Sequence, residues 1–310
     1  MLEIKEKNFI SAVVYVHNSE NYIREFLEKI LECLKNNFEK YEIICVNDSS
    51  SDKSTDIIKE VGKSVETSII NIINMSYFQG VEKSMLAGVD LAIGDFVFEF
   101  DSTIIDYDIN EIMNVYKKSL QGFDIVSASS NKKMKITSRL FYKIFNNNVL
   151  DMKTESFRIL SRRAINRINI ISSNIVYRKA VYYNSGLKTS NIVYEVKKKI
   201  KENSNETRYR RRLAVDSMIY FTNIGFKISF ILAAIMMAFS ILGFIYTMLV
   251  YLWLKNPIEG WTTMMIFMSF GFFGLFLLLS ILIKYASLIL ETTHQKQKYV
   301  FESIVKVNKN

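Results

Sequence analysis

Cysteine, histidine and proline are scarce in this chain of 310 residues, which contains two cysteines, two histidines and one proline. Two cysteines do not make the disulfide framework of a small secreted domain, so a reducing cytosol is the simplest compartment. Cys33 lies in a helix-period segment and Cys45 in a β-rich run, where both fit as small buried apolar residues. His17 and His294 match no zinc-ligand spacing with them. These shortages exclude disulfide-rich and zinc-finger proteins.

Charge is absent from two long apolar runs, 228–254 and 260–283. Each run exceeds the roughly 20 residues that a helix needs to cross a hydrocarbon core. Only residues 255–259 separate them, so the sequence predicts a transmembrane hairpin that returns the chain to its starting side. An enzyme tethered in this way is expected to meet a substrate that lives in the bilayer.

Positive charge, which gives the chain a net +9, gathers on either side of these runs. Lysines and arginines crowd positions 197–212 and recur after 283, whereas the predicted turn has only Lys255. The positive-inside rule therefore predicts that both ends face the cytoplasm, in a multi-pass protein of the inner membrane. The basic cluster is interpreted as a contact for membrane lipids, with a solvated surface as the alternative. Because no nucleic-acid-binding motif is present, a nucleic-acid partner is not expected.

Apolar β-rich runs alternate with helix-period segments over the first half of the chain. The predicted strands cover 9–16, 41–48, 68–74, 95–101 and 123–129, and the predicted helices cover 20–35, a segment from about 52, 80–92 and 109–121. The strands are almost continuously apolar, which is typical of a parallel sheet buried on both faces. The order predicts an α/β fold with an open, doubly wound, mostly parallel sheet.

The domain organisation follows from these patterns. The sequence predicts an α/β domain over 1–205, basic juxtamembrane helices over 206–227, the hairpin over 228–283 and a cytoplasmic tail over 284–310.

Polar residues follow two of the predicted strands, at the edge where such sheets bind ligands. Asp48, after Asn47, can accept hydrogen bonds from a nucleobase or ribose, although an ordinary strand-to-helix turn favours the same residue. Asp101 can hold a divalent metal against a diphosphate. Asp106 and Asp108 follow on the same loop, where helix capping is the competing interpretation and the preferred one for Asp108.

The order of these motifs resembles the family-2 glycosyltransferases, in particular their membrane-anchored branch around dolichyl-phosphate-mannose synthase and bacterial polyprenyl-phosphate glycosyltransferases. The likeness covers nearly the whole chain. The similar segments are VVYVHNSE (13–20), VNDSSSD (46–52), GVEKSMLAGVDLAIGD (80–95), SRLFYKIFN (138–146) and SFRILSRRAI (156–165).

This resemblance implies a glycosyltransferase A fold and an inverting transfer of a sugar from a nucleotide sugar to a polyprenyl phosphate, such as undecaprenyl phosphate, for a cell-envelope glycan. It implies Mg²⁺ or Mn²⁺ as cofactor, and oligomers are common in this branch. The implied nucleotide-binding residues are Asn18, Glu20, Asn47 and Asp48; the implied catalytic residues are Asp101 and Arg158; the implied acceptor-phosphate residues are Arg158, Arg162 and Arg163; and the implied metal ligands are Asp101 and Asp106.

The chain departs from the family pattern at several of these positions. Tyr15 replaces a proline and Asn47 the first Asp of the nucleoside motif. Thr103 replaces the second Asp of the Asp-x-Asp metal signature. Glu155–Ser156 stand where the branch has Gly-Asp. These changes are compatible with a different sugar nucleotide, weaker metal binding or lost catalysis.

The chemistry of a phosphate acceptor weakens the case for lost catalysis. A phosphate oxygen with a second pKa near 6 is already anionic at cytoplasmic pH, so it needs no strong general base. The first alternative is a transferase that extends a lipid-linked glycan with a sugar hydroxyl as nucleophile, for which Glu155 is the candidate base. The second alternative is a catalytically silent homologue that acts as a binding partner.

Overall fold

The structure is a computed structural model that describes residues 5–64, 69–131, 155–171, 177–196, 260–294 and 298–307, with scattered positions between 231 and 242. The chain divides into two compact units. The sheet unit comprises Met1–Leu213 and Gln297–Asn310, and the helical unit comprises Ala214–Lys296.

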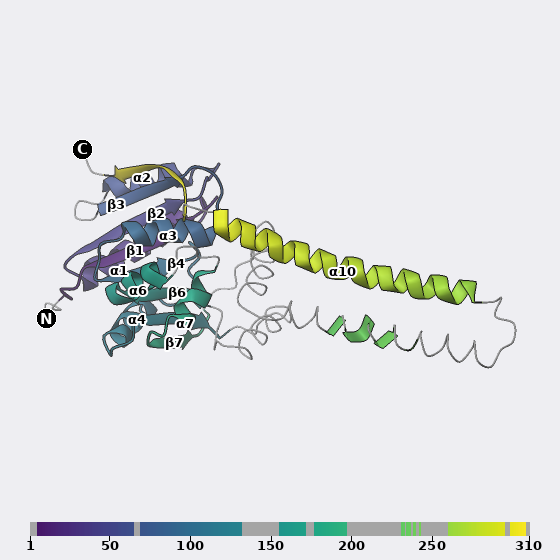
Figure 1. Ribbon diagram of the computed structural model, residues 1–310. Coiled ribbons are helices and arrows are strands. Elements are labelled where there is room, and N and C mark those ends of the chain that lie inside the picture. The colour runs from purple at the N-terminus through teal and green to yellow at the C-terminus, as the bar shows by residue number, and fades with distance from the viewer. Residues whose placement is uncertain are drawn as a thin grey trace. The chain divides into compact units, whose positions relative to one another are not determined.

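Over residues 10–130 the sheet unit alternates strands and helices in the order that the apolar pattern predicts (Figure 1). Its strands are β1 (Ile10–Val16), β2 (Tyr41–Asn47), β3 (Ile69–Met75), β4 (Phe96–Phe100), β5 (Ile125–Ser130), β6 (Glu155–Ser161), β7 (Thr189–Tyr194) and β8 (Phe301–Val307). Its helices are α1 (Ile23–Asn37), α2 (Ser54–Ser64), α3 (Val81–Leu91), α4 (Glu111–Ser119), α6 (Arg162–Ile171) and α7 (Arg178–Asn184). The strands predicted from the sequence are confirmed to within two residues at each end.

One mixed sheet holds all of these strands, in the order β7-β5-β6-β4-β1-β2-β3-β8. Strands β4, β1, β2 and β3 are parallel neighbours, and β7 is parallel to β5. Strand β6 runs antiparallel to both β4 and β5, and β8 runs antiparallel to β3. The predicted parallel arrangement is thus confirmed for β4, β1, β2 and β3, within a sheet that is mixed as a whole. The carboxyl ends of β1, β2 and β4 meet at one edge, as the site prediction requires.

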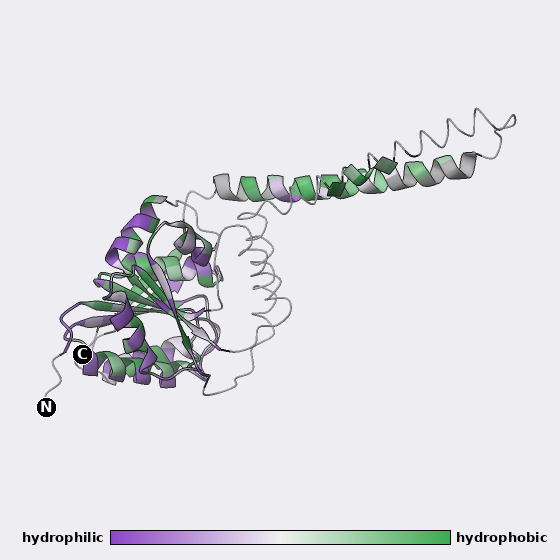
Figure 2. Ribbon diagram, turned by 90° about the horizontal axis from the view of Figure 1, so that it is seen from below, coloured by the Kyte–Doolittle hydropathy of each residue, from purple (hydrophilic) through white to green (hydrophobic). Residues whose placement is uncertain are grey.

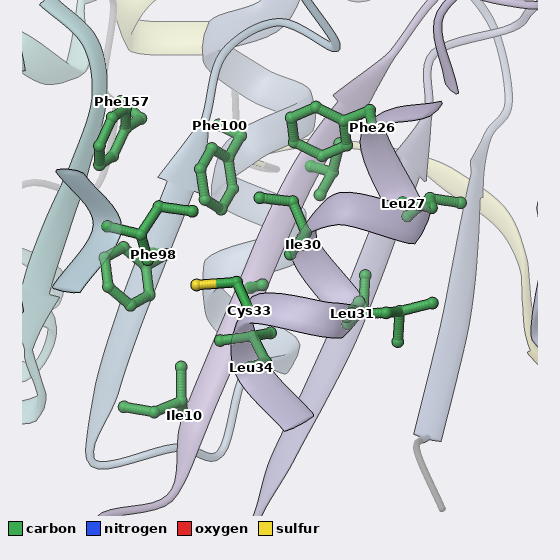
Figure 3. Close-up of a cluster of buried hydrophobic side chains, with 14 of the residues drawn as sticks. Ile10, Phe26, Leu27, Ile30, Leu31, Cys33, Leu34, Phe98, Phe100 and Phe157 are labelled. Atoms are coloured by element: carbon green, nitrogen blue, oxygen red, sulfur yellow. The ribbon is translucent and has the colours of Figure 1, made fainter. Parts of the chain in front are cut away.

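Helix α1 covers one face of the sheet with an apolar stripe of helical period. Its residues Phe26, Leu27, Ile30 and Leu34 are buried in one cluster with side chains of β1 and β4 (Figure 3). Figure 2 shows the same contrast as colour, because the central strands are mostly green whereas the surrounding helices alternate between green and purple. The strands are buried on both faces because helix α3 packs on the opposite face.

Close packing of α3 depends on Gly88, which the sequence places in the glycine-containing motif. A Cβ atom at this position would lie 2.2 Å from Cγ1 of Val13 and 2.8 Å from Cγ2 of Val46. Glycine therefore lets the helix approach β1 and β2 more closely than any other residue would. This approach brings the amino end of α3 to the carboxyl ends of the parallel strands.

The C-terminal residues differ from the prediction. The sequence predicted a tail over 284–310, but Phe301–Val307 form β8 at the edge of the sheet. Alternating exposure along β8, with Val305 and Val307 packed against the core, explains why the strand docks there.

The helical unit contains α10 (Trp261–His294), which extends well beyond the second apolar run. Within the described residues, no helix combines the length and the apolarity required of a membrane span. The first apolar run and the predicted juxtamembrane helices lie almost wholly outside the described residues. The transmembrane hairpin therefore stays a prediction.

Candidate active site

The loops after β1 and β2 are joined by hydrogen bonds at the carboxyl edge of the sheet. The side-chain oxygen of Asn18 accepts a hydrogen bond from the backbone N–H of Ser51 at 2.9 Å. Glu20 accepts one from the backbone N–H of Lys53 at 3.2 Å, and its own N–H donates to Asp52 at 2.9 Å. Asn18 has a φ of 47°, in the left-handed region that asparagine tolerates. Both Asn18 and Glu20 are exposed, so a ligand can reach them.

Asp48 is buried behind these loops. Its carboxylate accepts hydrogen bonds from the hydroxyl of Tyr15 at 3.0 Å, from the backbone N–H of Gln79 at 2.8 Å and from that of Gly80 at 2.7 Å. It therefore fixes the loop between β3 and α3. The predicted hydrogen bond from Asp48 to a nucleoside would compete with these three contacts, so the structure gives this residue a positioning role.

Asn47 is likewise almost buried, at 8 % exposure. Its side-chain amide donates to Asn74 of β3 at 3.0 Å, and its oxygen accepts a hydrogen bond from the backbone N–H of Ser50 at 3.1 Å. The four predicted nucleotide residues are thus together at one edge, the outer two open to solvent and the inner two supporting the loops.

Asp101 follows β4 at the same edge and is held by two arginines. Its Oδ2 accepts a hydrogen bond from Arg158 at 2.7 Å, and its Oδ1 accepts one from Arg178 at 2.6 Å. Both arginines are fully buried, whereas the side chain of Asp101 is 20 % exposed. One arginine comes from β6, the other from the start of α7.

Glu99 of β4, two residues before Asp101, contacts the same two arginines. It lies between two apolar residues of β4, so the alternation of the strand points it toward the face that α3 covers. Its two carboxylate oxygens accept hydrogen bonds from Arg158 at 2.7 Å and from Arg178 at 2.5 Å, and Tyr182 donates a third at 2.8 Å. Glu99 is fully buried.

Two more carboxylates complete what we call the buried charge cluster, which consists of Glu82, Glu99, Asp101, Glu155, Arg158 and Arg178. Glu155 accepts a hydrogen bond from Nε of Arg158 at 2.9 Å. Glu82 of α3 accepts two hydrogen bonds from Arg178, from Nε at 3.0 Å and from the backbone N–H at 2.8 Å. Each arginine therefore binds three carboxylates.

These ion pairs outweigh the cost of burying the charges. Burial acts to raise the pKa of Asp101, but the charges of Arg158 and Arg178 hold that pKa far below its usual value. Burial likewise acts to lower the pKa of Arg158, and the surrounding carboxylates raise that pKa well above its ordinary value. The same balance raises the pKa of Arg178. All three groups are ionised at neutral pH.

As arranged here, these residues do not fit a divalent cation. Both oxygens of Asp101 carry guanidinium groups, and Thr103, which replaces the second Asp of the metal signature, is buried. Asp106 accepts a hydrogen bond from Tyr194 at 2.7 Å. Among the residues that the structure describes, no three His, Cys, Asp or Glu side chains form a metal-binding group. A cation at Asp101 would have to displace two arginines that four other carboxylate contacts hold in place.

Arg158 is placed differently from its predicted role at an acceptor phosphate. All three of its side-chain nitrogens bind carboxylates, so a phosphate cannot contact the guanidinium unless those ion pairs open. The prediction considered its charge and its segment but not its burial.

Arg162 and Arg163 lie at the opposite edge of the sheet. Because β6 is antiparallel to β4, residues after Ser161 follow the amino end of β4, where Ser161 pairs with Phe96. Arg162 donates to the backbone carbonyl of Ala92 at 2.9 Å, and Arg163 binds Asp124 at 2.7 Å. The structure does not bring either residue to Asp101, and the predicted acceptor group is thus split between two edges.

Sequence reasoning missed Arg178, Tyr182, Glu82 and Glu99. One signal was available, because a glutamate inside the apolar segment FVFEF needs hydrogen-bond donors or a cationic partner if the strand is buried on both faces. The partner of Glu99 could not be identified as Arg178 from the sequence, because Arg178 lies far along the chain in a short helix.

Comparison with known proteins identifies the family. The profile of Glycosyl transferase family 2 matches residues 11–186. The chain belongs to this family. The match spans the strands that carry the exposed loops and the buried charge cluster, so the protein is a glycosyltransferase.

Two relatives are similar over most of their length, and a third over less than half of it. An uncharacterized glycosyltransferase of Bacillus subtilis is 25 % identical over 314 residues, covering 94 % of this chain and 93 % of the relative. The bactoprenol glucosyl transferase of Shigella phage SfV is 24 % identical over 272 residues, covering 84 % and 87 %. Undecaprenyl-phosphate 4-deoxy-4-formamido-L-arabinose transferase of Photorhabdus laumondii is 30 % identical over 139 residues, covering 44 % and 42 %.

Solved structures share the fold. Glucosyl-3-phosphoglycerate synthase of Mycobacterium tuberculosis, in complex with Mn²⁺, uridine diphosphate and glucosyl-3-phosphoglycerate, matches with a TM-score of 0.51 and 12 % identity, over 70 % of this chain and 80 % of that one. At this identity the likeness shows the fold alone, and it supports the predicted glycosyltransferase architecture of the sheet unit.

Proposed function

We propose that this glycosyltransferase moves a sugar from a nucleotide-sugar donor to a polyprenyl phosphate, such as undecaprenyl phosphate, at the cytoplasmic face of the membrane. The names of two relatives motivate the acceptor, since one is a bactoprenol glucosyl transferase and another an undecaprenyl-phosphate transferase. The first of these is similar over 84 % of this chain.

One structural observation carries the proposal. The exposed residues Asn18 and Glu20, on loops supported by Asn47 and Asp48, lie at the same sheet edge as Asp101. We place the nucleoside of the donor on the loops after β1 and β2, and the sugar and diphosphate toward the end of β4. This order follows the arrangement of the strands, because β1 lies between β2 and β4.

The proposed reaction needs little proton transfer. An oxygen of the acceptor phosphate forms a bond to the anomeric carbon of the sugar, and the bond from that carbon to the donor diphosphate breaks. The nucleoside diphosphate leaves with the bonding electron pair, and inversion at the anomeric carbon is what the family resemblance implies. Because the nucleophile is already an anion, the chain has to orient the two substrates and exclude water.

In this proposal Asp101 and Arg158 are positioning residues. Their ion pairs hold the end of β4 against β6 and α7, and Asp101, whose side chain is 20 % exposed, lies at the edge where the donor is placed. The Mg²⁺ or Mn²⁺ that the resemblance implies has no step in this proposal, because the oxygens of Asp101 are bound to guanidinium groups.

The alternative with a sugar hydroxyl as nucleophile is less consistent with the site. It requires a carboxylate that is free to take a proton, and Glu155 was the candidate. That carboxylate accepts hydrogen bonds from Arg158 at 2.9 Å and from Tyr183 at 3.0 Å, and it is 9 % exposed. A phosphate nucleophile does not need such a base.

The proposed membrane location rests on the two apolar runs and on their basic flanks. Large apolar side chains on α10, such as Phe272, Phe273 and Phe276, are more than half exposed, which is unfavourable in water. Strand β8 belongs to the same sheet as β1 to β7, so the chain before the runs and the chain after them lie on one side. Two crossings satisfy this requirement.

The test is transfer by the purified full-length chain in detergent, with a panel of radiolabelled nucleotide sugars. Three acceptors are compared: undecaprenyl phosphate, undecaprenol and an undecaprenyl-diphosphate-linked sugar. We expect product only with the phosphate. Product only with the sugar-bearing lipid would establish the hydroxyl alternative, and no product with any donor would favour the silent homologue.

A pair of variants separates the two edges of the sheet. Asn18→Ala removes an exposed donor-side residue and should raise the KM for the nucleotide sugar, whereas Arg163→Ala at the opposite edge should leave it unchanged.

A further inference from the structure

The segment that follows α10 in the chain returns to the candidate donor site. Residues 298–300 approach the loop between β3 and α3, and β8 then pairs with β3, with Ser303 opposite Asn74. Without β8, strand β3 would be the edge of the sheet beside the nucleotide loops. The C-terminal segment therefore covers the strand that adjoins Asn47 and Asp48.

One chain of hydrogen bonds leads from β8 to Asn47. The side-chain amide of Asn74 donates to the hydroxyl of Ser303 at 3.0 Å. The side-chain oxygen of Asn74 accepts a hydrogen bond from the amide of Asn47, also at 3.0 Å. The backbone N–H of Ser50 binds the oxygen of Asn47 and so turns the amide of Asn47 toward the oxygen of Asn74. The hydroxyl of Ser303 accepts from the other end of the same rigid amide plane, so this contact helps to hold Asn74 in place against Asn47.

A second chain of hydrogen bonds leads from residue 300 to Asp48. The side-chain amide of Gln79 donates to the backbone carbonyl of Val300 at 2.5 Å, and its oxygen accepts a hydrogen bond from the backbone N–H of Val300 at 3.1 Å. The backbone N–H of the same Gln79 donates to Asp48 at 2.8 Å. Gln79 thus joins the C-terminal segment to the carboxylate that fixes the loop.

We propose that Ser303 and Gln79 are positioning residues for the donor, through which the C-terminal segment sets the geometry of the nucleotide-binding loops. The inference rests on the proposed function, because it takes the loops after β1 and β2 as the donor site. Ser303 reaches Asn47 through Asn74, and Val300 reaches Asp48 through Gln79. These two independent contacts distinguish the segment from an edge strand that only adds stability.

The same segment supplies a matched control. Tyr299 donates a hydrogen bond to Asp90 of α3 at 3.1 Å, so it also anchors the segment, but this contact belongs to neither of the two hydrogen-bond chains that lead to Asn47 and Asp48. Tyr299→Phe removes an anchoring hydrogen bond of similar length while leaving both chains of contacts in place. A general loosening of the segment and a specific effect on the donor loops are therefore separable.

The experiment uses the full-length chain in detergent. Affinity for UDP and GDP is measured by calorimetry, and the KM for donor, the KM for undecaprenyl phosphate and kcat are measured by transfer. Gln79→Ala loses two hydrogen bonds and should weaken nucleotide affinity about 5- to 20-fold, and Ser303→Ala should weaken it about 2- to 10-fold. Both should leave kcat and the acceptor KM within about twofold, as should Tyr299→Phe for every constant.

Gln79→Glu provides the milder variant if Gln79→Ala does not fold. It keeps the acceptor for the N–H of Val300 but replaces the donor with an oxygen that faces a carbonyl, so affinity should again fall. Equal nucleotide affinity in wild type, Ser303→Ala and Gln79→Glu would overturn the inference, as would an equal loss in Tyr299→Phe. A wild type that binds no nucleotide would instead refute the proposed function, and the inference would fall with it.

Discussion

Replacing Arg178 with methionine removes one of the two cations that hold the buried charge cluster together. The guanidinium contacts Glu82 at 3.0 Å, Glu99 at 2.5 Å and Asp101 at 2.6 Å. Methionine has a similar length and fills much of the same volume, so the principal change is electrostatic. It leaves three carboxylates with Arg158 as their remaining partner in the cluster, and Arg158 touches only two of them.

The expected loss of stability is large. Removing one partner of a buried ion pair costs about 3–5 kcal/mol, because the remaining charge is desolvated without compensation. For a unit of this size, each kcal/mol lowers the unfolding temperature by about 2–4 °C, so we expect a decrease of about 6–20 °C. Arg24→Met is the control, because the Arg24–Glu60 pair is on the surface, with side chains 48 % and 65 % exposed. An exposed pair contributes about 0–1 kcal/mol.

The two cysteines of the chain provide the assay. Cys33 of α1 and Cys45 of β2 are both buried, and burial raises the pKa of Cys33 to about 11 and that of Cys45 to about 12. A fluorogenic maleimide reacts with the thiolate, so labelling on heating reports the unfolding of the sheet unit. The signal comes from the protein itself and tolerates detergent.

A second substitution tests whether the loss is electrostatic. In the double variant Arg178→Met with Glu82→Gln, one of the orphaned carboxylates is neutralised, so the two substitutions together should destabilise less than the sum of their separate effects. An unfolding temperature of Arg178→Met within about 2 °C of wild type would refute the reasoning, as would strict additivity of the two substitutions.

Three further outcomes follow from the same contacts. The lowered pKa of Asp101 contributes stability at pH values above its unfolded pKa of about 4, and this contribution is lost as the pH falls through the folded pKa. Asp101→Asn should therefore make the free energy of unfolding, measured by circular dichroism, less dependent on pH below about pH 4. An unchanged pH dependence would contradict the ion pairs. Because both oxygens of Asp101 are bound to arginines, transfer should persist in excess EDTA, and a strict requirement for Mg²⁺ or Mn²⁺ would show that these pairs open. Cysteines introduced at Asn256 and Glu302 should react oppositely with an impermeant maleimide in intact cells, only Asn256 being labelled; labelling of Glu302 alone would reverse the topology.

The sequence predicted the parallel part of the sheet well because the signal is local. Segments such as 41–48 are apolar without interruption, and buried parallel strands require this. It also placed Asn47, Asp48 and Asp101 at one edge, since that follows from parallel strands alone, whereas Asn18 and Glu20 came from the family resemblance. What a local pattern does not contain is the partner and direction of a strand that pairs with distant segments, and this explains why β6 and β8 were not predicted.

Strand β6 shows how one undetermined direction affects the site. Read along the chain, Arg158, Arg162 and Arg163 form a single basic segment. Antiparallel pairing with β4 puts Arg158 beside Glu99 and carries the other two to the opposite edge. The resemblance supplied residue types but not this pairing, so the predicted acceptor group combined a residue from the middle of β6 with two residues at the start of α6. Strand β8 was missed because its partner, β3, lies more than half the chain away.

Burial of Glu99 shows where sequence reasoning can be extended. A carboxylate in the middle of a strand covered on both faces needs hydrogen-bond donors or a cationic partner, and these must come from a neighbouring strand or from an element that packs on the same face. Once β6 is known to be antiparallel, the register itself identifies Arg158, which pairs directly with Glu99. Arg178 remains hidden even then, because it is 79 residues from Glu99 and enters from α7, which packing rather than strand pairing positions. Of the two arginines, the strand residue is therefore accessible to inference from sheet order, whereas the helix residue requires the folded structure.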